Sequence, residues 1–126
     1  MTKILLVEDN EMNRDMLKRR LERRGFEVVP ACDGREGILA AETESPDLIL
    51  MDLSLPVIDC WEATRILKST PVAAEIPILV LTAHATTNAR ERAIKAGCDD
   101  FETKPVVFDH LLSKIDVLLD RKAVLL

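Results

Sequence analysis

One stretch of the chain constrains its fold more than any other, the segment Asp47-Leu48-Ile49-Leu50-Met51-Asp52-Leu53-Ser54-Leu55-Pro56. Its apolar run is too short for a helix and too apolar for a surface strand, so it predicts a buried parallel strand. The strand ends on the carboxylate of Asp52, and a loop marked by Pro56 follows. In an open α/β sheet, ligands and chemistry gather at the carboxyl ends of the strands. Asp52 is therefore a candidate functional residue, although an aspartate here can also simply cap the next turn.

Length and composition bound the class of protein. The chain has 126 residues, a formal net charge of −5 and three cysteines without paired spacing. This length suits one domain with an ordinary hydrophobic core. The acidic balance argues against direct nucleic-acid binding, and scattered cysteines suit a reducing compartment. The apolar run Ile4–Val7 is too short for a signal peptide or a membrane span, so we expect a cytoplasmic protein without membrane attachment.

Short apolar runs alternate with helical patterns along the whole chain. Strands are predicted at Ile4–Val7, Glu27–Ala31, Leu48–Asp52, Ile76–Leu81 and Phe101–Thr103. Helices are predicted around Met12–Leu21, after Asp33 as far as Ser45, at Trp61–Lys68, at Thr87–Ala96 and around Leu111–Leu119. This alternation is typical of a parallel sheet covered on both faces. We predict an α/β fold, a (βα)5 three-layer sandwich with the flavodoxin-like strand order 2-1-3-4-5.

That strand order brings the ends of the first and third strands together, so Glu8, Asp9 and Asp52 should meet in one pocket. Converging carboxylates repel one another and need cations; Mg²⁺ prefers such oxygen ligands. Lys104 and Thr82, at the ends of the fifth and fourth strands, add an ammonium and a hydroxyl. Each residue alone has a plainer structural explanation, but together they suit phosphoryl transfer to a carboxylate.

Four motifs stand at these strand ends: Val7-Glu8-Asp9-Asn10, Met51-Asp52 with Pro56 four residues on, Leu81-Thr82-Ala83, and Lys104-Pro105. They give the chain a resemblance to the receiver domain of bacterial two-component response regulators, over about residues 3–120. This resemblance implies that Asp52 is the phosphoacceptor. It also implies that Mg²⁺, for which Mn²⁺ is expected to substitute, is bound by Glu8, Asp9, Asp52 and the backbone carbonyl of Ser54.

Further roles follow from the same resemblance. Lys104 would contact the phosphoryl group, Thr82 would move toward it, and Phe101 would be the switch aromatic residue that rotates inward. Ser54 and His84 would tune the lifetime of the phosphoryl group. The Lys104–Pro105 bond is often cis in similar proteins. Cys60 stands where the family usually has glycine, which leaves the path of the preceding loop open.

The resemblance also implies how such a protein works. Residues 1–126 would form a single receiver domain without an output domain, like the single-domain CheY and DivK type. A sensor histidine kinase, a histidine phosphotransfer protein, or both would donate the phosphoryl group, and a downstream effector protein would read it. The domain would phosphorylate and dephosphorylate itself rather than act as a turnover enzyme. The basic first helix, with Arg14, Lys18, Arg19, Arg20, Arg23 and Arg24, is either a solvated face or a docking surface for the donor.

Three other classes of protein compete with this interpretation. A haloacid-dehalogenase-like phosphatase also uses an aspartate at a strand end, but it needs a second acid where this chain has Ser54. A flavodoxin-like cofactor binder needs a phosphate-binding loop after the first strand, and Glu8-Asp9-Asn10 would repel a phosphate. A receiver-fold interaction module that works without phosphate is the remaining alternative.

Overall fold

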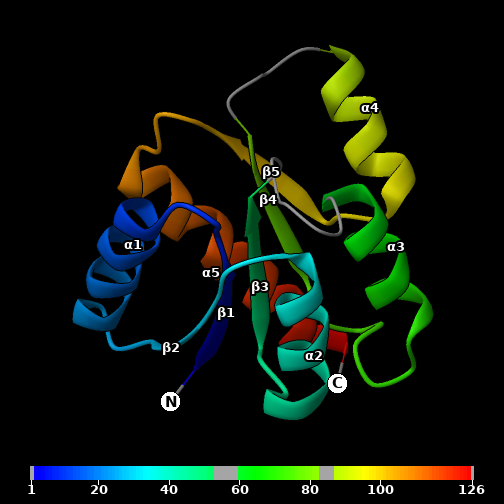
Figure 1. Ribbon diagram of the computed structural model, residues 1–126, viewed down its shortest axis with the longest axis horizontal. Coiled ribbons are helices and arrows are strands. Elements are labelled where there is room, and N and C mark those ends of the chain that lie inside the picture. The colour runs from blue at the N-terminus through cyan, green and yellow to red at the C-terminus, as the bar shows by residue number, and fades with distance from the viewer. Residues whose placement is uncertain (1, 53–59, 83–86, 126) are drawn as a thin grey trace.

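The computed structural model describes residues 2–52, 60–82 and 87–125, in which strands and helices alternate (Figure 1). The strands are β1 (Lys3–Val7), β2 (Glu27–Ala31), β3 (Leu48–Asp52), β4 (Ile78–Thr82) and β5 (Asp100–Thr103). The helices are α1 (Glu11–Arg23), α2 (Gly34–Glu44), α3 (Cys60–Ser69), α4 (Thr87–Ala96) and α5 (Phe108–Leu125). None of these helices combines the length and the apolar character that a membrane crossing requires.

The strands form one parallel sheet in the order β2-β1-β3-β4-β5, which confirms the predicted fold. Helices α1 and α5 cover one face of the sheet, α2 and α3 cover the other, and α4 lies beside α3 (Figure 1). The order of the strands reverses direction between β1 and β3, where ligand-binding crevices open in folds of this kind.

Two apolar cores form because successive residues of a strand point to opposite faces of the sheet. Leu5 and Val7 of β1 belong to the core under α2 and α3, whereas Ile4 and Leu6 belong to the core under α1 and α5. All residues of β3 and β4 are buried. Each large side chain of this kind stabilises the fold by roughly 1.5–3 kcal/mol, so the central strands form a rigid support for whatever lies at their ends.

Side-chain caps fix the start of the two helices that follow β1 and β2. The side chain of Asn10 accepts a hydrogen bond from the backbone N–H of Asn13, and Asp33 accepts one from Glu36. Such caps contribute about 1 kcal/mol each. The Asn10 cap therefore starts α1 immediately after Glu8 and Asp9, the acidic pair that follows β1.

Some element boundaries differ from the sequence-based prediction. β4 begins at Ile78 instead of Ile76, because Pro77 has no N–H to donate to a neighbouring strand. Helix α5 continues to Leu125, whereas the sequence pattern placed its apolar face only as far as Leu119. The Lys104–Pro105 bond is cis, as the resemblance implied.

Cys60 adopts an ordinary backbone conformation. It is the first residue of α3, and its side chain is fully buried in the core beneath that helix. Among the non-glycine residues that the structure describes, only Ser45 has a positive φ. A cysteine therefore fits at this position without needing the conformational freedom of glycine.

Gly37 of α2 lies so close to β1 that a methyl group would not fit. A Cβ atom there would lie 2.8 Å from Cγ2 and 3.2 Å from Cγ1 of the buried Val7. We expect Gly37→Ala to lower the free energy of unfolding by about 1–2 kcal/mol, because the overpacking outweighs the gain in helix propensity. Urea denaturation followed by circular dichroism measures this change.

The control is the same substitution made in a Val7→Ala protein, where the space opposite Gly37 is free. There Gly37→Ala should raise the free energy of unfolding by up to about 1 kcal/mol through helix propensity alone. An equal loss of stability in both backgrounds would contradict the proposed contact.

Candidate functional site at the ends of strands β1 and β3

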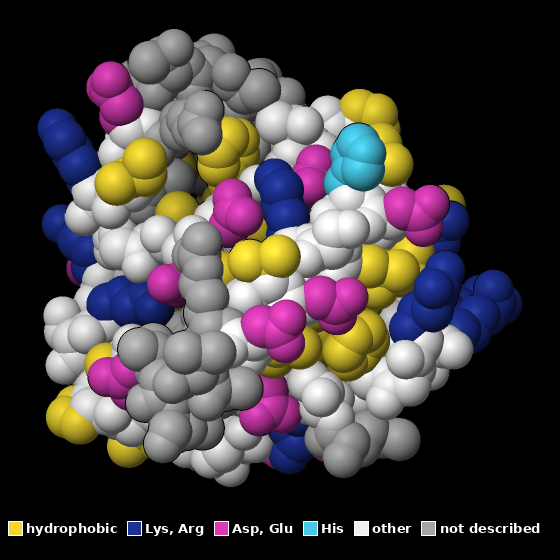
Figure 2. All heavy atoms as spheres, turned by 180° about the vertical axis from the view of Figure 1, so that it is seen from behind, with side chains coloured by type: hydrophobic (Ala, Val, Ile, Leu, Met, Phe, Trp, Pro, Cys, Tyr) yellow, Lys and Arg dark blue, Asp and Glu magenta, His cyan; other side chains and the backbone are white. Residues whose placement is uncertain are grey.

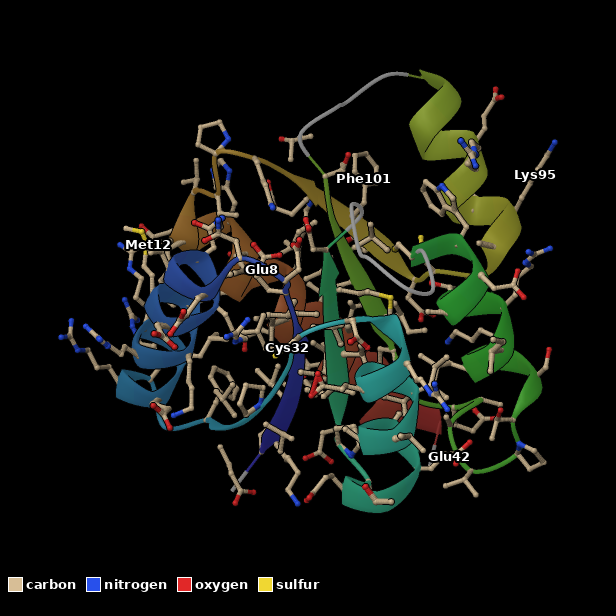
Figure 3. The ribbon with its side chains drawn as sticks, in the orientation of Figure 1. Glu8, Met12, Cys32, Glu42, Lys95 and Phe101 are labelled. Atoms are coloured by element: carbon tan, nitrogen blue, oxygen red, sulfur yellow. The ribbon has the colours of Figure 1, made fainter. Side chains whose placement is uncertain are left out.

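Three carboxylates converge at the carboxyl ends of β1 and β3. Glu8 and Asp9 follow β1 directly, Asp52 is the last residue of β3, and the two strands are neighbours in the sheet. One carboxylate oxygen from each residue lies within 4.8 Å of the others. Glu8 and Asp52 are only 1% and 5% exposed, whereas Asp9 is exposed. The structure thus brings together the three acids that the strand order predicted; Figure 3 shows where Glu8 lies among them.

Lys104 supplies the positive charge nearest to these acids within the described part of the chain. Its Nζ lies 2.7 Å from Oδ1 of Asp52, to which it donates a hydrogen bond, and 3.7 Å from Oε1 of Glu8. The backbone N–H of Lys104 donates to the carbonyl of Thr82 at 2.7 Å. That hydrogen bond holds the segment after β5 against the end of β4, where the buried Thr82 lies.

The electrostatics of the pocket favour a further cation. Burial, followed by the repulsion from Asp52, raises the pKa of Glu8 to about 7 despite the attraction of Lys104. Burial alone would lower the pKa of Lys104, but its hydrogen bond with Asp52 and the charges of Asp52 and Glu8 raise it. The ammonium of Lys104 therefore stays charged, and one ammonium cannot balance three carboxylates.

The donor set fits a hard divalent cation. Both carboxylate oxygens of Glu8 are buried and accept no hydrogen bond from a described residue. Burying carboxylate oxygens without hydrogen-bond donors destabilises the fold. An ion such as Mg²⁺ is commonly coordinated by one or two carboxylates together with water. Glu8, Asp9 and Asp52 could hold such an ion. The backbone carbonyl of Ser54 and the side chain of His84 lie outside the described residues.

Phe101 lies on β5, half-buried against the apolar core beneath α2 and α3 (Figure 3). Lys114 of α5 contacts the same strand: its ammonium donates to the carbonyl of Phe101, lies 5.4 Å from the ring centroid, and is 3.3 Å from the carboxylate of Glu102. Sequence reasoning did not identify Lys114. Lys114 lies three residues after Leu111 in the predicted helix, and this spacing does not indicate whether its side chain faces β5 or water.

Two further residues lie beside the site, and their places there were not identified from the sequence. The guanidinium of Arg14 donates to the backbone carbonyl of Glu8 at 2.9 Å. Asn13 lines a small cavity of about 270 Å³ together with Glu8 and Lys104. Both residues lie one turn beyond the Asn10 cap, but that position alone does not tell which polar side chain of α1 turns toward the pocket.

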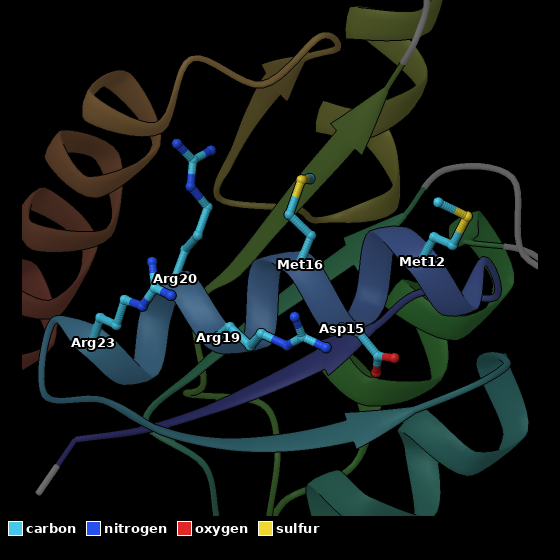
Figure 4. A pocket seen from close by; sticks show the side chains of 6 residues that line it. All are labelled: Met12, Asp15, Met16, Arg19, Arg20 and Arg23. Carbon is cyan, nitrogen blue, oxygen red and sulfur yellow. The ribbon is translucent and has the colours of Figure 1, made fainter.

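The exposed face of α1 forms a shallow hollow next to the site (Figure 4). Its volume is about 430 Å³, and it is lined by Met12, Asp15, Met16, Arg19, Arg20 and Arg23. The side chain of Met12 is 82% exposed and that of Met16 is 46% exposed. Lysine and arginine side chains gather along this edge of the molecule, as the view from behind shows (Figure 2). A helix face that contacts only water would not be expected to expose two methionines among its arginines, so this face has the character of a binding surface.

Comparison with known proteins agrees with this geometry. Residues 4–116 match the family model of the response regulator receiver domain. The response regulator MprA of Mycolicibacterium vanbaalenii is 37% identical over 119 residues, which cover 94% of this chain and 51% of that protein. The alkaline phosphatase synthesis transcriptional regulatory protein PhoP of Bacillus subtilis is 36% identical over 122 residues, 97% of this chain and 50% of that protein. The chain thus spans about half the length of these curated relatives.

A solved structure is also similar in its overall fold. The receiver domain of the sensor histidine kinase PA1611 from Pseudomonas aeruginosa superposes with a TM-score of 0.88 at 34% identity, covering 94% of this chain and 98% of that one. That structure is described as having a magnesium ion coordinated in its active site cleft.

The fold and the acidic pocket define a doubly wound α/β domain with an acidic site at the strand ends. The chain belongs to the response regulator receiver domain family.

The raised pKa of Glu8 makes the stability of the metal-free protein depend on pH. The pKa of Glu8 is about 7 in the folded protein, whereas its ordinary pKa is 4.5. The protonated side chain therefore contributes to the free energy of unfolding at low pH, and this contribution is lost as the pH rises from 4.5 through about 7. The loss should approach about 3 kcal/mol. Urea denaturation at a series of pH values in the presence of a chelator measures it.

Glu8→Gln is the matched control, because it keeps the shape of the side chain and removes its titration. The difference in unfolding free energy between the native protein and this variant should change with pH in that range and level off above it. A difference that does not vary with pH would show that folding does not raise the pKa of Glu8.

Proposed function

We propose that Asp52 accepts a phosphoryl group from a sensor histidine kinase or a histidine phosphotransfer protein, in a reaction that depends on Mg²⁺ or on Mn²⁺ as its substitute. The observation that supports this most directly is the contact of 2.7 Å between Nζ of Lys104 and Oδ1 of Asp52, inside a pocket that also contains Glu8 and Asp9. A nucleophilic carboxylate and a fixed ammonium beside a cation site suit phosphoryl transfer.

In this reaction a carboxylate oxygen of Asp52 forms a bond to phosphorus while the phosphorus–nitrogen bond of the donor histidine breaks. The electron pair of that bond returns to the imidazole nitrogen. Lys104, already within reach of Asp52, would pair with the transferring oxygens. Bound Mg²⁺, held by Glu8, Asp9, Asp52 and the carbonyl of Ser54, would supply further positive charge to those oxygens. Attack of water on the phosphoryl group would then break its bond to the Asp52 oxygen, release inorganic phosphate and return the free carboxylate. In this proposal the phosphorylated chain itself is the signal, so the domain would act as a phosphoacceptor that phosphorylates and dephosphorylates itself rather than as a turnover enzyme.

The signal would leave the site through β4 and β5. A phosphoryl group on Asp52 is a strong acceptor that would draw Lys104 and the hydroxyl of Thr82 toward it. Movement of Thr82 would give Phe101 room to turn inward, changing the surface that β5 forms with its neighbouring helices. Ser54 and His84 would set how long the phosphoryl group lasts. A downstream effector protein would bind the changed surface.

We further propose that the donor docks on the α1 face. The hollow there combines two exposed methionines with Arg19, Arg20 and Arg23, so it would suit an apolar helix with acidic residues along its edges. It adjoins a cavity that Met16 and Arg20 also line and that contains Glu8 and Lys104. A histidine on a helix docked at α1 would therefore lie next to the site.

Phosphorylation should occur on Asp52 and require Mg²⁺. After incubation with acetyl phosphate, the intact mass of the native protein should increase by one phosphoryl group with Mg²⁺ and should stay unchanged with a chelator. Asp52→Asn removes the nucleophilic oxygen, keeps the size of the side chain, and should gain nothing.

The outcomes separate the competing classes. No gain in mass, with a donor that phosphorylates another receiver domain under the same conditions, would favour an interaction module that works without phosphate. A gain that persists in Asp52→Asn would mean that another residue is the acceptor.

The α1 surface should affect transfer from the protein donor alone. Arg19→Glu combined with Arg23→Glu should lower kcat/KM for a phosphorylated histidine phosphotransfer protein by at least about tenfold, because like charges would then face each other. Phosphorylation by acetyl phosphate should not change, since neither residue contacts the acidic pocket. Radiolabel transfer measures both rates. An equal decrease with both donors would contradict the docking surface.

A further inference from the structure

A second basic hollow lies on the other side of the molecule, between α3 and α4. Its volume is about 320 Å³, and it is lined by Trp61, Arg65, Arg92, Lys95 and Ala96. Figure 1 shows the two helices side by side, and lysine and arginine side chains also appear along that edge in Figure 2. This volume is at the lower end of the range for small-molecule sites in proteins. The hollow shares no residue with the acidic pocket or with the α1 surface.

The charges around this hollow favour an anion. Three of its five lining residues are cationic, although the whole chain has a net charge of −5. Arg65 forms an ion pair with Glu62 of the same helix. Neither Arg92 nor Lys95 forms an ion pair with a residue that the structure describes, and the side chain of Lys95 projects from α4 (Figure 3). Arginine binds phosphate through two parallel hydrogen bonds, and lysine binds it as a point charge.

An aromatic side chain distinguishes this hollow from an ordinary basic patch. Trp61 is half-buried at the start of α3, and the guanidinium of Arg92 lies 5.2 Å from the centroid of its ring. Indole and guanidinium are both flat groups on which a nucleobase stacks. The hollow therefore combines a stacking surface with a pair of cations, which is what a ligand that joins a flat ring to a phosphate needs.

We propose that the hollow between α3 and α4 binds a nucleoside monophosphate. The base would stack on the layer that Trp61 and Arg92 form, and the phosphate would bind Lys95 and Arg65. The small volume favours a single nucleotide over a dinucleotide. This binding makes and breaks no covalent bond, and it does not depend on Asp52 being phosphorylated.

The chain contains one tryptophan, so fluorescence reports on this hollow directly. Adenosine monophosphate and guanosine monophosphate would be titrated into the full chain in the presence of a chelator, so that no divalent ion is bound at the acidic pocket. We expect saturable quenching with a dissociation constant below about 1 mM for at least one nucleotide. Adenosine and inorganic phosphate, each lacking one half of the ligand, should bind at least about tenfold more weakly.

Arg92→Gln combined with Lys95→Gln should weaken nucleotide binding at least about tenfold. Arg19→Gln combined with Arg23→Gln makes the same change in charge on α1 and should leave the affinity unchanged. Calorimetry is the second readout, since replacing Arg92 also alters the surroundings of Trp61. Arg92 and Lys95 are exposed, so thermal unfolding should match the native protein; Arg65→Gln, which should also weaken binding, gives an independent test.

Four results would overturn the proposal. The first two are the absence of saturable nucleotide binding and an equal affinity for inorganic phosphate or adenosine. The other two are an unchanged nucleotide affinity when Arg92 and Lys95 are replaced, and an equal loss of nucleotide affinity when Arg19 and Arg23 are replaced. Asp52→Asn should bind the nucleotide as the native protein does, so that failure of phosphorylation and failure of nucleotide binding are seen separately.

Discussion

The structure depends on an unfavourable interaction, the convergence of three carboxylates at the point where the strand order reverses. Two unit charges 4 Å apart repel by about 4 kcal/mol at an effective dielectric constant near 20. Glu8 and Asp52 are buried next to each other, and the ammonium of Lys104 balances only part of their charge. The fully buried strands β3 and β4 hold this arrangement in place, because moving the carboxylates apart would disrupt two apolar cores. The repulsion makes the pocket selective for cations.

Much of this could be predicted from the sequence, because the important residues stand next to strong local signals. The buried strands are short apolar runs, and Glu8, Asp9, Asp52 and Thr82 stand at their ends, so the strand order alone brought the acids together. The contacts of Arg14 and Lys114 could not be predicted. They depend on how α1 and α5 are rotated against the sheet, and helix periodicity defines an apolar face without specifying which polar side chain at its edge reaches a neighbouring strand.

The net charge of the chain says little about what its surfaces bind. The chain has a net negative charge, yet its surface has two basic edges, and the chemistry of these edges differs. On α1 the arginines surround exposed methionines, and Arg20 and Arg24 also lie over the ring of Phe108. Between α3 and α4 the cations surround an indole. Flexible methionines adapt to a protein surface, whereas a tryptophan with an arginine offers a flat platform. The apolar side chains that accompany the cations therefore distinguish the two edges, which the net charge of the chain does not.

Strand β5 connects the acidic pocket to the surface of α5 by a short physical path. After its carboxyl end, Lys104 is bound through its side chain to Asp52 and through its backbone N–H to Thr82. Within the strand, Lys114 of α5 is bound to the carbonyl of Phe101 and paired with Glu102. A charge added at Asp52 acts on Lys104 first, and any shift of β5 that follows must change the contacts of Lys114. The ends of this path are two lysines only ten residues apart in the chain, so the contacts that join the acidic pocket to the surface of α5 are few.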